Sequence, residues 1–143
     1  MPLQFHPNRG QILMCDFSQG FRLPEMVKNR PVIVLTPPLV GRANLVTVVC
    51  MSTVRPTPVQ PYHCVIPSRE LPMTSFFQGR ESWVKGDMIY AVGFDRLAPV
   101  SIRVAGGRRD YSRKVLSDER MREVVSCVLH GLAMGELVSH LQK

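Results

Sequence analysis

The sequence predicts a mainly β fold, in which a small, strongly curved antiparallel barrel packs against one helix near the C-terminus. Two observations support this class. Short runs of β-branched and aromatic residues are bounded by Gly, Pro, Asn or charge, and clear helical periodicity is confined to the last part of the chain. No helical segments alternate with these runs, which disfavours a parallel α/β sheet.

The expected strands are short segments rich in Val, Ile, Leu or aromatic residues, each closed by a turn-forming or charged residue. In chain order they are residues 11–17, 32–35, 45–51, 62–66, 88–94 and 101–104.

One helix is expected over residues 117–133. Apolar residues recur there at the spacing of a single helical face, namely Met121, Val124, Val125, Val128, Leu129 and Leu132. Ser117 is a suitable N-cap, and Asp118 and Glu119 occupy the first turn, where the helix dipole favours negative charge.

Two segments are expected as loops within one domain that spans residues 1–143. Residues 67–82 are polar, with Gly79 and two Phe, and predict a mobile loop. Residues 103–114 carry five basic residues around a Gly pair: Arg103, Arg108, Arg109, Arg113 and Lys114. This segment either tracks a phosphate backbone or is an ordinary solvated loop.

The composition describes a globular protein with a net charge of +7 and 45% hydrophobic residues. A cationic excess favours nucleic acid or an acidic protein as partner, although charge alone does not decide between them. No apolar stretch approaches the roughly 18 residues that suggest a membrane span, and the N-terminus lacks the apolar core of a signal peptide. We therefore expect a cytoplasmic protein without membrane contact.

The cysteines are Cys15, Cys50, Cys64 and Cys127. They lie far apart, form no CxxC pair and sit mostly in apolar runs, so we expect small core residues and neither a metal nor another cofactor.

The N-terminal part presents one Arg in an unusual position. The segment N-R-P-V-I-V-L places Arg30 at the mouth of a run of β-branched residues. Pro31 has a fixed φ and favours extended geometry at Arg30. Arg30 is therefore a rigidly presented strand-edge cation, suited either to a phosphate or simply to solvent.

The order of motifs resembles the MazF/PemK family of toxin endoribonucleases from bacterial toxin–antitoxin pairs. G-Q-I-L-M-C-D-F at residues 10–17 is followed by a Gly-containing loop, by R-P-V-I-V-L at 30–35 and by a strand that ends in Ser-Thr at 52–53. P-Y-H at 61–63, W-V-K-G-D-M-I at 83–89 and F-D-R-L at 94–97 fit the later part of the pattern. The resemblance covers residues 9–133.

The resemblance implies an SH3-like barrel, usually a homodimer, that cuts single-stranded RNA without a metal. The 2′-hydroxyl would attack the phosphate, leaving a cyclic phosphate and a 5′-hydroxyl. It further implies a growth-inhibiting toxin with a cognate antitoxin protein as partner.

The candidate catalytic residues follow from this pattern. Arg30 matches the family's catalytic Arg, since a guanidinium can bind two phosphate oxygens. Ser52 and Thr53 replace the family's Thr, and which hydroxyl would act stays open. Either could simply cap its own backbone. Glu25 and Asp87 are alternative acids for proton transfer or for positioning Arg30.

The candidate RNA-binding residues are Lys28, Lys85, Arg22, Arg55, His63 and Phe21. Lys85 is the basic partner of Asp87 in the family pattern, and the two could equally form a structural ion pair. His63 could transfer a proton or be structural. Phe21 lies in a loop, where a base could stack on it, whereas Trp83 reads as half-buried packing.

Two alternatives from other classes stay open. The first is a non-catalytic toxin on the same fold that binds a protein such as DNA gyrase, since fold does not fix function. The second is a degenerate barrel that binds nucleic acid without cutting it.

Overall fold

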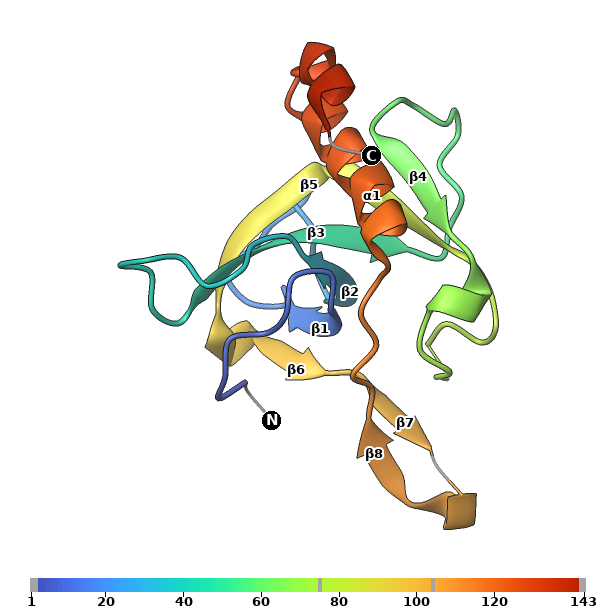
Figure 1. The fold of residues 1–143 in the computed structure, drawn as a ribbon. Coiled ribbons are helices and arrows are strands. Elements are labelled where there is room, and N and C mark those ends of the chain that lie inside the picture. Colours follow the sequence, from blue (N-terminus) through green and yellow to red (C-terminus); the bar gives the residue numbers. More distant parts are fainter. Residues whose placement is uncertain (1–2, 75, 104, 142–143) are drawn as a thin grey trace.

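A computed structural model describes residues 3–74, 76–103 and 105–141 of the chain, and Figure 1 shows its ribbon. The strands are β1 (Ile12–Asp16), β2 (Asn29–Val34), β3 (Leu45–Ser52), β4 (His63–Ile66), β5 (Ser82–Gly93), β6 (Leu97–Pro99), β7 (Ser101–Arg103) and β8 (Arg109–Tyr111). The α-helix is α1 (Asp118–Gly131), and the 3-10 helices are η1 (Ser68–Glu70), η2 (Phe94–Arg96), η3 (Ala105–Gly107) and η4 (Gly135–His140).

Six strands form one antiparallel sheet in the order β4-β5-β3-β2-β1-β6, and β7 and β8 form a separate hairpin. Because β5 lies next to the β4 edge and continues through η2 into β6 at the opposite edge, the sheet curls strongly (Figure 1). Within the described residues no ladder joins β4 to β6, so the sheet stays open. The predicted class, mainly antiparallel β with a C-terminal helix, is confirmed.

Alternating side chains divide the apolar residues between the two faces of the sheet. One face packs against α1 and the loop before β5, with Ile12, Ile33, Val49, Met51, Val84, Met121 and Val124 among its buried residues. The other face encloses Leu13, Cys15, Phe17, Val32, Val34, Val48 and Cys50. Each strand in the middle of the sheet therefore contributes to both cores.

Helix α1 begins where the sequence predicts. The Ser117 hydroxyl oxygen accepts a hydrogen bond from the Arg120 N–H at 3.2 Å, which caps the first turn. The helix then crosses β5 at Gly86, where an added Cβ would collide with the Cys127 carbonyl oxygen. A glycine on β5 thus permits the close approach that fixes α1 on the sheet.

The structure differs from the sequence prediction in three segments. Strand β5 begins at Ser82 rather than at residue 88. Residues 103–114 are not a plain loop, because β7 and β8 pair across them; residue 104, the last of the expected sixth strand, lies outside the described residues. Strand β6 was not predicted, since its three residues are too short to show a period.

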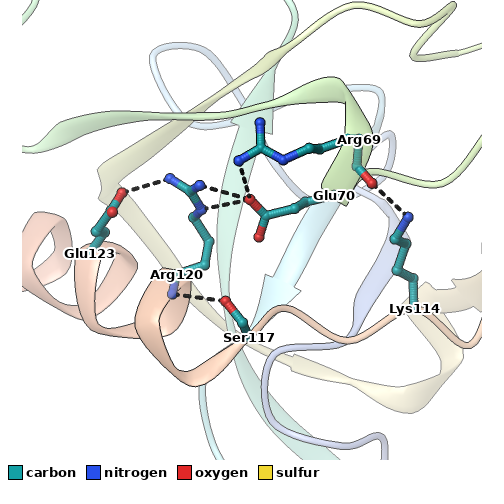
Figure 2. Close-up of polar contacts among 6 residues, drawn as sticks. All are labelled: Arg69, Glu70, Lys114, Ser117, Arg120 and Glu123. Atoms are coloured by element: carbon teal, nitrogen blue, oxygen red, sulfur yellow. Dashed lines mark hydrogen bonds and ion pairs between the residues drawn. The ribbon is translucent and has the colours of Figure 1, made fainter. Parts of the chain in front are cut away.

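Residues 67–82 are also more ordered than the expected mobile loop. Leu71 and Phe77 are each 1% exposed and belong to the core under α1. Figure 2 shows the polar contacts that hold η1: Arg120 donates from Nε and from an Nη to the same Glu70 oxygen, at 3.1 and 2.7 Å. The segment is therefore held to α1 through Glu70 and to the core through Leu71 and Phe77.

The cysteines behave as the composition predicts. Cys15, Cys50 and Cys127 are buried and Cys64 is partly buried, all as free thiols. Burial raises the pKa of the Cys15 thiol to about 12 and that of Cys50 likewise to about 12, so both stay protonated and unreactive. Among the described helices, none has the length and apolar character needed to cross a membrane.

Candidate active site

The strand register brings the main candidate residues to one face of the sheet. Val32 of β2 pairs with Cys50 of β3, and Arg30 and Ser52 each lie two residues beyond this pair, which puts them on the same side of the sheet. On β5, Trp83 pairs with Ser52 and Lys85 with Cys50. Lys85 in turn pairs with His63 of β4. Paired residues project to the same side of a sheet. We call this surface the Arg30 face: Arg30, Ser52, His63, Trp83 and Lys85.

Arg30 is held between two buried neighbours. It pairs with the buried Cys15 of β1 and precedes Pro31, which restricts the backbone. Its guanidinium is only partly exposed, and its Nε is buried without a hydrogen-bond partner in the part of the chain that the structure describes. A buried donor without an acceptor is costly. Arg30 therefore keeps an unused donor at Nε, on a side chain that is partly exposed as a whole.

Ser52 lies at the end of β3 and is 7% exposed. Its hydroxyl oxygen accepts a hydrogen bond from the Val54 N–H at 3.1 Å, and its carbonyl accepts one from the Ser82 hydroxyl at 3.2 Å. Ser52 thus caps its own backbone, but its hydroxyl proton can still be donated. Thr53 is half-buried just beyond the strand.

A bulge in β5 sets the positions of Lys85 and Asp87. The register jumps so that Ile89 pairs with Val49 while Lys85 pairs with Cys50, and residues 86–88 are the extra residues between them. The Gly86 N–H donates to the Tyr62 carbonyl at 2.7 Å, which ties the bulge to the segment before β4. Asp87 projects from the bulge and is exposed.

The charges of Lys85, Arg30 and Asp87 all affect the pKa of the buried Cys50 thiol, so these three residues surround it. The positive charges of Lys85 and Arg30 lower the pKa of its thiol, and the negative charge of Asp87 raises it, although burial dominates. Burial lowers the pKa of His63, which is on the Arg30 face, and the Asp87 charge opposes this effect. The charge of Asp87 is therefore felt on this face.

His63 is suited to a neutral role. Burial lowers the pKa of its imidazole and Lys85 lowers it further, against the opposing effect of Asp87. Its Nδ1 accepts a hydrogen bond from the Gln60 N–H at 3.0 Å, which requires a free lone pair. The ring is therefore a neutral Nε2–H tautomer near pH 7, which disfavours His63 as a proton donor.

Glu25 lies in the loop between β1 and β2 and is exposed. Its carboxylate accepts a hydrogen bond from the Arg22 N–H at 2.8 Å, and no ion pair joins it to Arg30 among the described residues. The next residue, Met26, donates its N–H to the Tyr90 hydroxyl at 2.9 Å. Burial raises the pKa of Tyr90, and the charge of Glu25 adds a smaller effect in the same direction. Tyr90 thereby fastens the Glu25 loop to β5.

The remaining RNA-binding candidates have different surroundings. Arg55 lies over the Trp83 ring at 5.6 Å from its centroid, next to Ser52 in the register. Arg22 and Lys28 are exposed in the β1–β2 loop. Phe21 is not free to stack on a base as expected, because it packs edge-on against Phe17 and Tyr90 and lies beneath the Arg96 guanidinium.

Sequence reasoning missed the places of two aromatic residues. Trp83 is half-buried as expected, but it also lies on the Arg30 face beside Lys85. The alternation from Ser82 to Gly86 was the available signal that this strand starts before residue 88. Tyr90 has no signal in the sequence, since its bond to Met26 spans 64 residues. In the described residues, no three His, Cys, Asp or Glu side chains gather where they could hold a metal ion.

Comparison with known proteins gives one family match and several similar structures. Residues 8–132 match the family described as PemK-like, MazF-like toxin of type II toxin–antitoxin system. An uncharacterized protein of Haemophilus influenzae is 34% identical over 105 residues, which cover 66% of this chain and 71% of that protein.

The structural similarities extend over most of the fold. MazF (Form-I) from Deinococcus radiodurans has a TM-score of 0.62 at 16% identity, covering 92% of this chain and 100% of its own. An endoribonuclease from a mycobacterial species, solved in complex with its cognate antitoxin, has a TM-score of 0.58 at 19% identity. The match covers 90% of this chain and 97% of that endoribonuclease chain.

Proposed function

Since this chain belongs to the PemK-like, MazF-like toxins of type II toxin–antitoxin systems, we propose that it is a metal-independent mRNA interferase that cuts single-stranded RNA at specific sequences. One observation carries the proposal. Arg30, with a buried Nε that has no partner among the described residues, and Ser52 each lie two residues beyond the Val32–Cys50 pair, so both project to the same face of the sheet. A guanidinium beside a hydroxyl matches the oxygens of a phosphodiester.

In the proposed reaction the RNA 2′-hydroxyl attacks its own phosphate in line. Negative charge then grows on the non-bridging oxygens, and Arg30 would stabilise it with two parallel hydrogen bonds. The Ser52 hydroxyl, whose oxygen already accepts from Val54, would donate its proton to one of these oxygens. Thr53 is the alternative donor.

Proton transfer needs a base for the 2′-hydroxyl and an acid for the leaving 5′-oxygen. We assign the base to Asp87, which is exposed and acts electrostatically on the Arg30 face, and the acid to Lys85 on that face. Glu25, across the Tyr90 contact, is the alternative base. The products would be a 2′,3′-cyclic phosphate and a 5′-hydroxyl.

The proposal includes two protein partners and a location. A cognate antitoxin would lay an acidic segment over the cationic Arg30 face. The similar mycobacterial endoribonuclease was solved in complex with its cognate antitoxin. A second copy would form a homodimer, for which the exposed Leu132, Met134 and Leu137 offer apolar area after α1. Both would act in the cytoplasm, where mRNA is.

The test is cleavage of single-stranded RNA by the purified protein in excess EDTA, with the cut ends mapped. The proposal expects specific cuts with cyclic-phosphate ends that disappear in Arg30→Ala and persist in Arg42→Ala, a control in the loop between β2 and β3. RNA that is bound but never cut would instead support a degenerate binding protein. Intact RNA with tight binding to DNA gyrase would support a non-catalytic toxin.

A further inference from the structure

The hairpin of β7 and β8 stands away from the main sheet (Figure 1). Between this hairpin and the loop before β5 lies a cavity of about 610 Å³. Its lining residues come from both segments: Met73, Thr74, Gln78, Gly79, Ser101, Ile102 and Arg109. None of them belongs to the Arg30 face.

We propose that this hairpin and cavity form a second RNA-binding subsite, which holds a nucleotide a few positions away from the cleaved phosphate. The inference rests on the proposed function, because it takes RNA as the substrate. It adds residues that are not part of the reaction: Arg109 would contact a phosphate and Gln78 the edge of a base.

The lining of the cavity has the chemistry that a nucleotide requires. Met73 and Ile102 offer apolar surface to the face of a base. Gln78 supplies an amide that can both donate to and accept from a base edge, and Thr74 adds a hydroxyl. Arg109 adds a cation for the phosphate. Apolar, hydrogen-bonding and cationic groups thus line one hollow.

The charge of the hairpin favours a polyanion. Arg108, Arg109 and Arg113 are exposed, and none of the ion pairs among the described residues involves them. The one acid between residues 103 and 114 is Asp110, whose carboxylate accepts a hydrogen bond from the Tyr111 N–H at 2.8 Å. The surface therefore keeps a net positive charge.

The two walls of the cavity are tied together. Lys114, which follows β8, donates from Nζ to the Arg69 carbonyl at 2.9 Å (Figure 2). Arg69 lies in η1, which Arg120 holds through Glu70. These contacts limit how far the hairpin moves from the loop, and a preformed site loses less entropy when it binds.

The cavity wall is joined to the candidate active site by a short stretch of chain. Gly79 precedes Ser82 by three residues, and an extended chain covers at most about 11 Å over that length. Ser82 is buried and its hydroxyl donates to the Ser52 carbonyl. An RNA strand that occupies both sites therefore has to pass around this end of β5, because the loop before β5 packs on the face of the sheet opposite Arg30.

The test measures binding of 2′-O-methyl RNAs of increasing length, which cannot be attacked and stay intact. In the double variant R108S/R109S, long RNA should bind roughly fivefold to tenfold more weakly, with a salt dependence shallower by about 1.4 if two phosphate contacts are lost. A short RNA that fills only the Arg30 face should bind as before. R42S, which removes one positive charge outside the hairpin, is the control for a loss of charge elsewhere. Q78L should shift the preferred base without changing the salt dependence.

The inference is overturned if R108S/R109S binds long RNA as the unaltered protein does. A loss confined to an acidic peptide such as polyglutamate would assign the hairpin to a protein partner and would also overturn it. Failure of the proposed function gives a different result. In that case unmodified RNA stays uncut both by the unaltered protein and by R108S/R109S.

Discussion

The Cys127 carbonyl oxygen of α1 packs against Gly86 in the bulge of β5, at the place where any side chain would extend. The contact is reciprocal, because Gly131 of the same helix faces the Gly86 backbone with equally little room. On either side of Gly86 lie Lys85 and Asp87, two candidate site residues. The packing of α1 on one face of the sheet therefore sets the backbone positions of Lys85 and Asp87 in the bulge.

Gly86→Ala should destabilise the fold by about 1–3 kcal/mol, because the new methyl group displaces backbone rather than a flexible side chain. It should also reduce RNA cleavage at temperatures where the protein stays folded, since Lys85 and Asp87 move with the bulge. Thermal unfolding and cleavage assays measure the two effects. Gly93→Ala in the same strand is the control, because its Cβ would meet only Asn44 O at an ordinary 3.8 Å.

Substitution of Arg30 should separate stability from activity. Its buried Nε has no partner among the described residues, so Arg30→Leu removes an unsatisfied donor and should leave the free energy of unfolding unchanged or higher. Cleavage should fall about 10²-fold or more, because the phosphate charge loses its stabilising group. Urea unfolding alongside cleavage rates tests this, and a large loss of stability would show that Arg30 is structural.

His63 should titrate below its usual pKa of about 6.5, because burial and Lys85 disfavour the charged ring. Asp87→Asn should lower the midpoint further, and Lys85→Gln should raise it. The NMR shifts of the His63 ring protons report each midpoint. A midpoint above the usual value would contradict the neutral tautomer inferred from the Gln60 contact.

The same shift has a consequence for stability. Because the pKa of His63 is lower in the folded state, the unfolded chain binds more protons between the two pKa values. The contribution of this group is complete above about pH 6.5 and is lost as the pH falls through the folded-state value. His63→Gln should therefore flatten the pH dependence of the urea midpoint in that window.

The sequence predicted those elements whose signal is local. Helix α1 shows its face in the spacing from Met121 to Leu132, and β1 to β4 are apolar runs closed by turn residues. The first half of β5 was missed because Lys85, Gly86 and Asp87 interrupt its apolar residues. That bulge is stabilised by α1, which is distant in the chain.

The candidate site was predictable in its residues and not in its geometry. Arg30 and Ser52 can be named from the motifs, but their place on one face depends on the β2–β3 register, which the sequence does not state. The aromatic cluster around Phe21 and the Tyr90–Met26 bond join distant segments. Strand β7 was predicted within residues 101–104, whereas β8 was missed because its three residues are too few to show a period and include Asp110, which has low β propensity.

The ion-pair network in Figure 2 should stabilise the fold modestly and support long-RNA binding more strongly. Arg120 and Glu70 are partly shielded from solvent, with side chains 18% and 22% exposed. A double-mutant cycle with Arg120→Met and Glu70→Gln should give a coupling of about 1 kcal/mol in urea unfolding.

Glu70→Gln should also weaken binding of long 2′-O-methyl RNA while short RNA binds normally, because η1 carries the Arg69 carbonyl that holds Lys114. Glu119→Gln, an exposed acid in the first turn of α1 outside the network, is the matched control. Equal affinities for long RNA in both variants would show that the network does not position the hairpin.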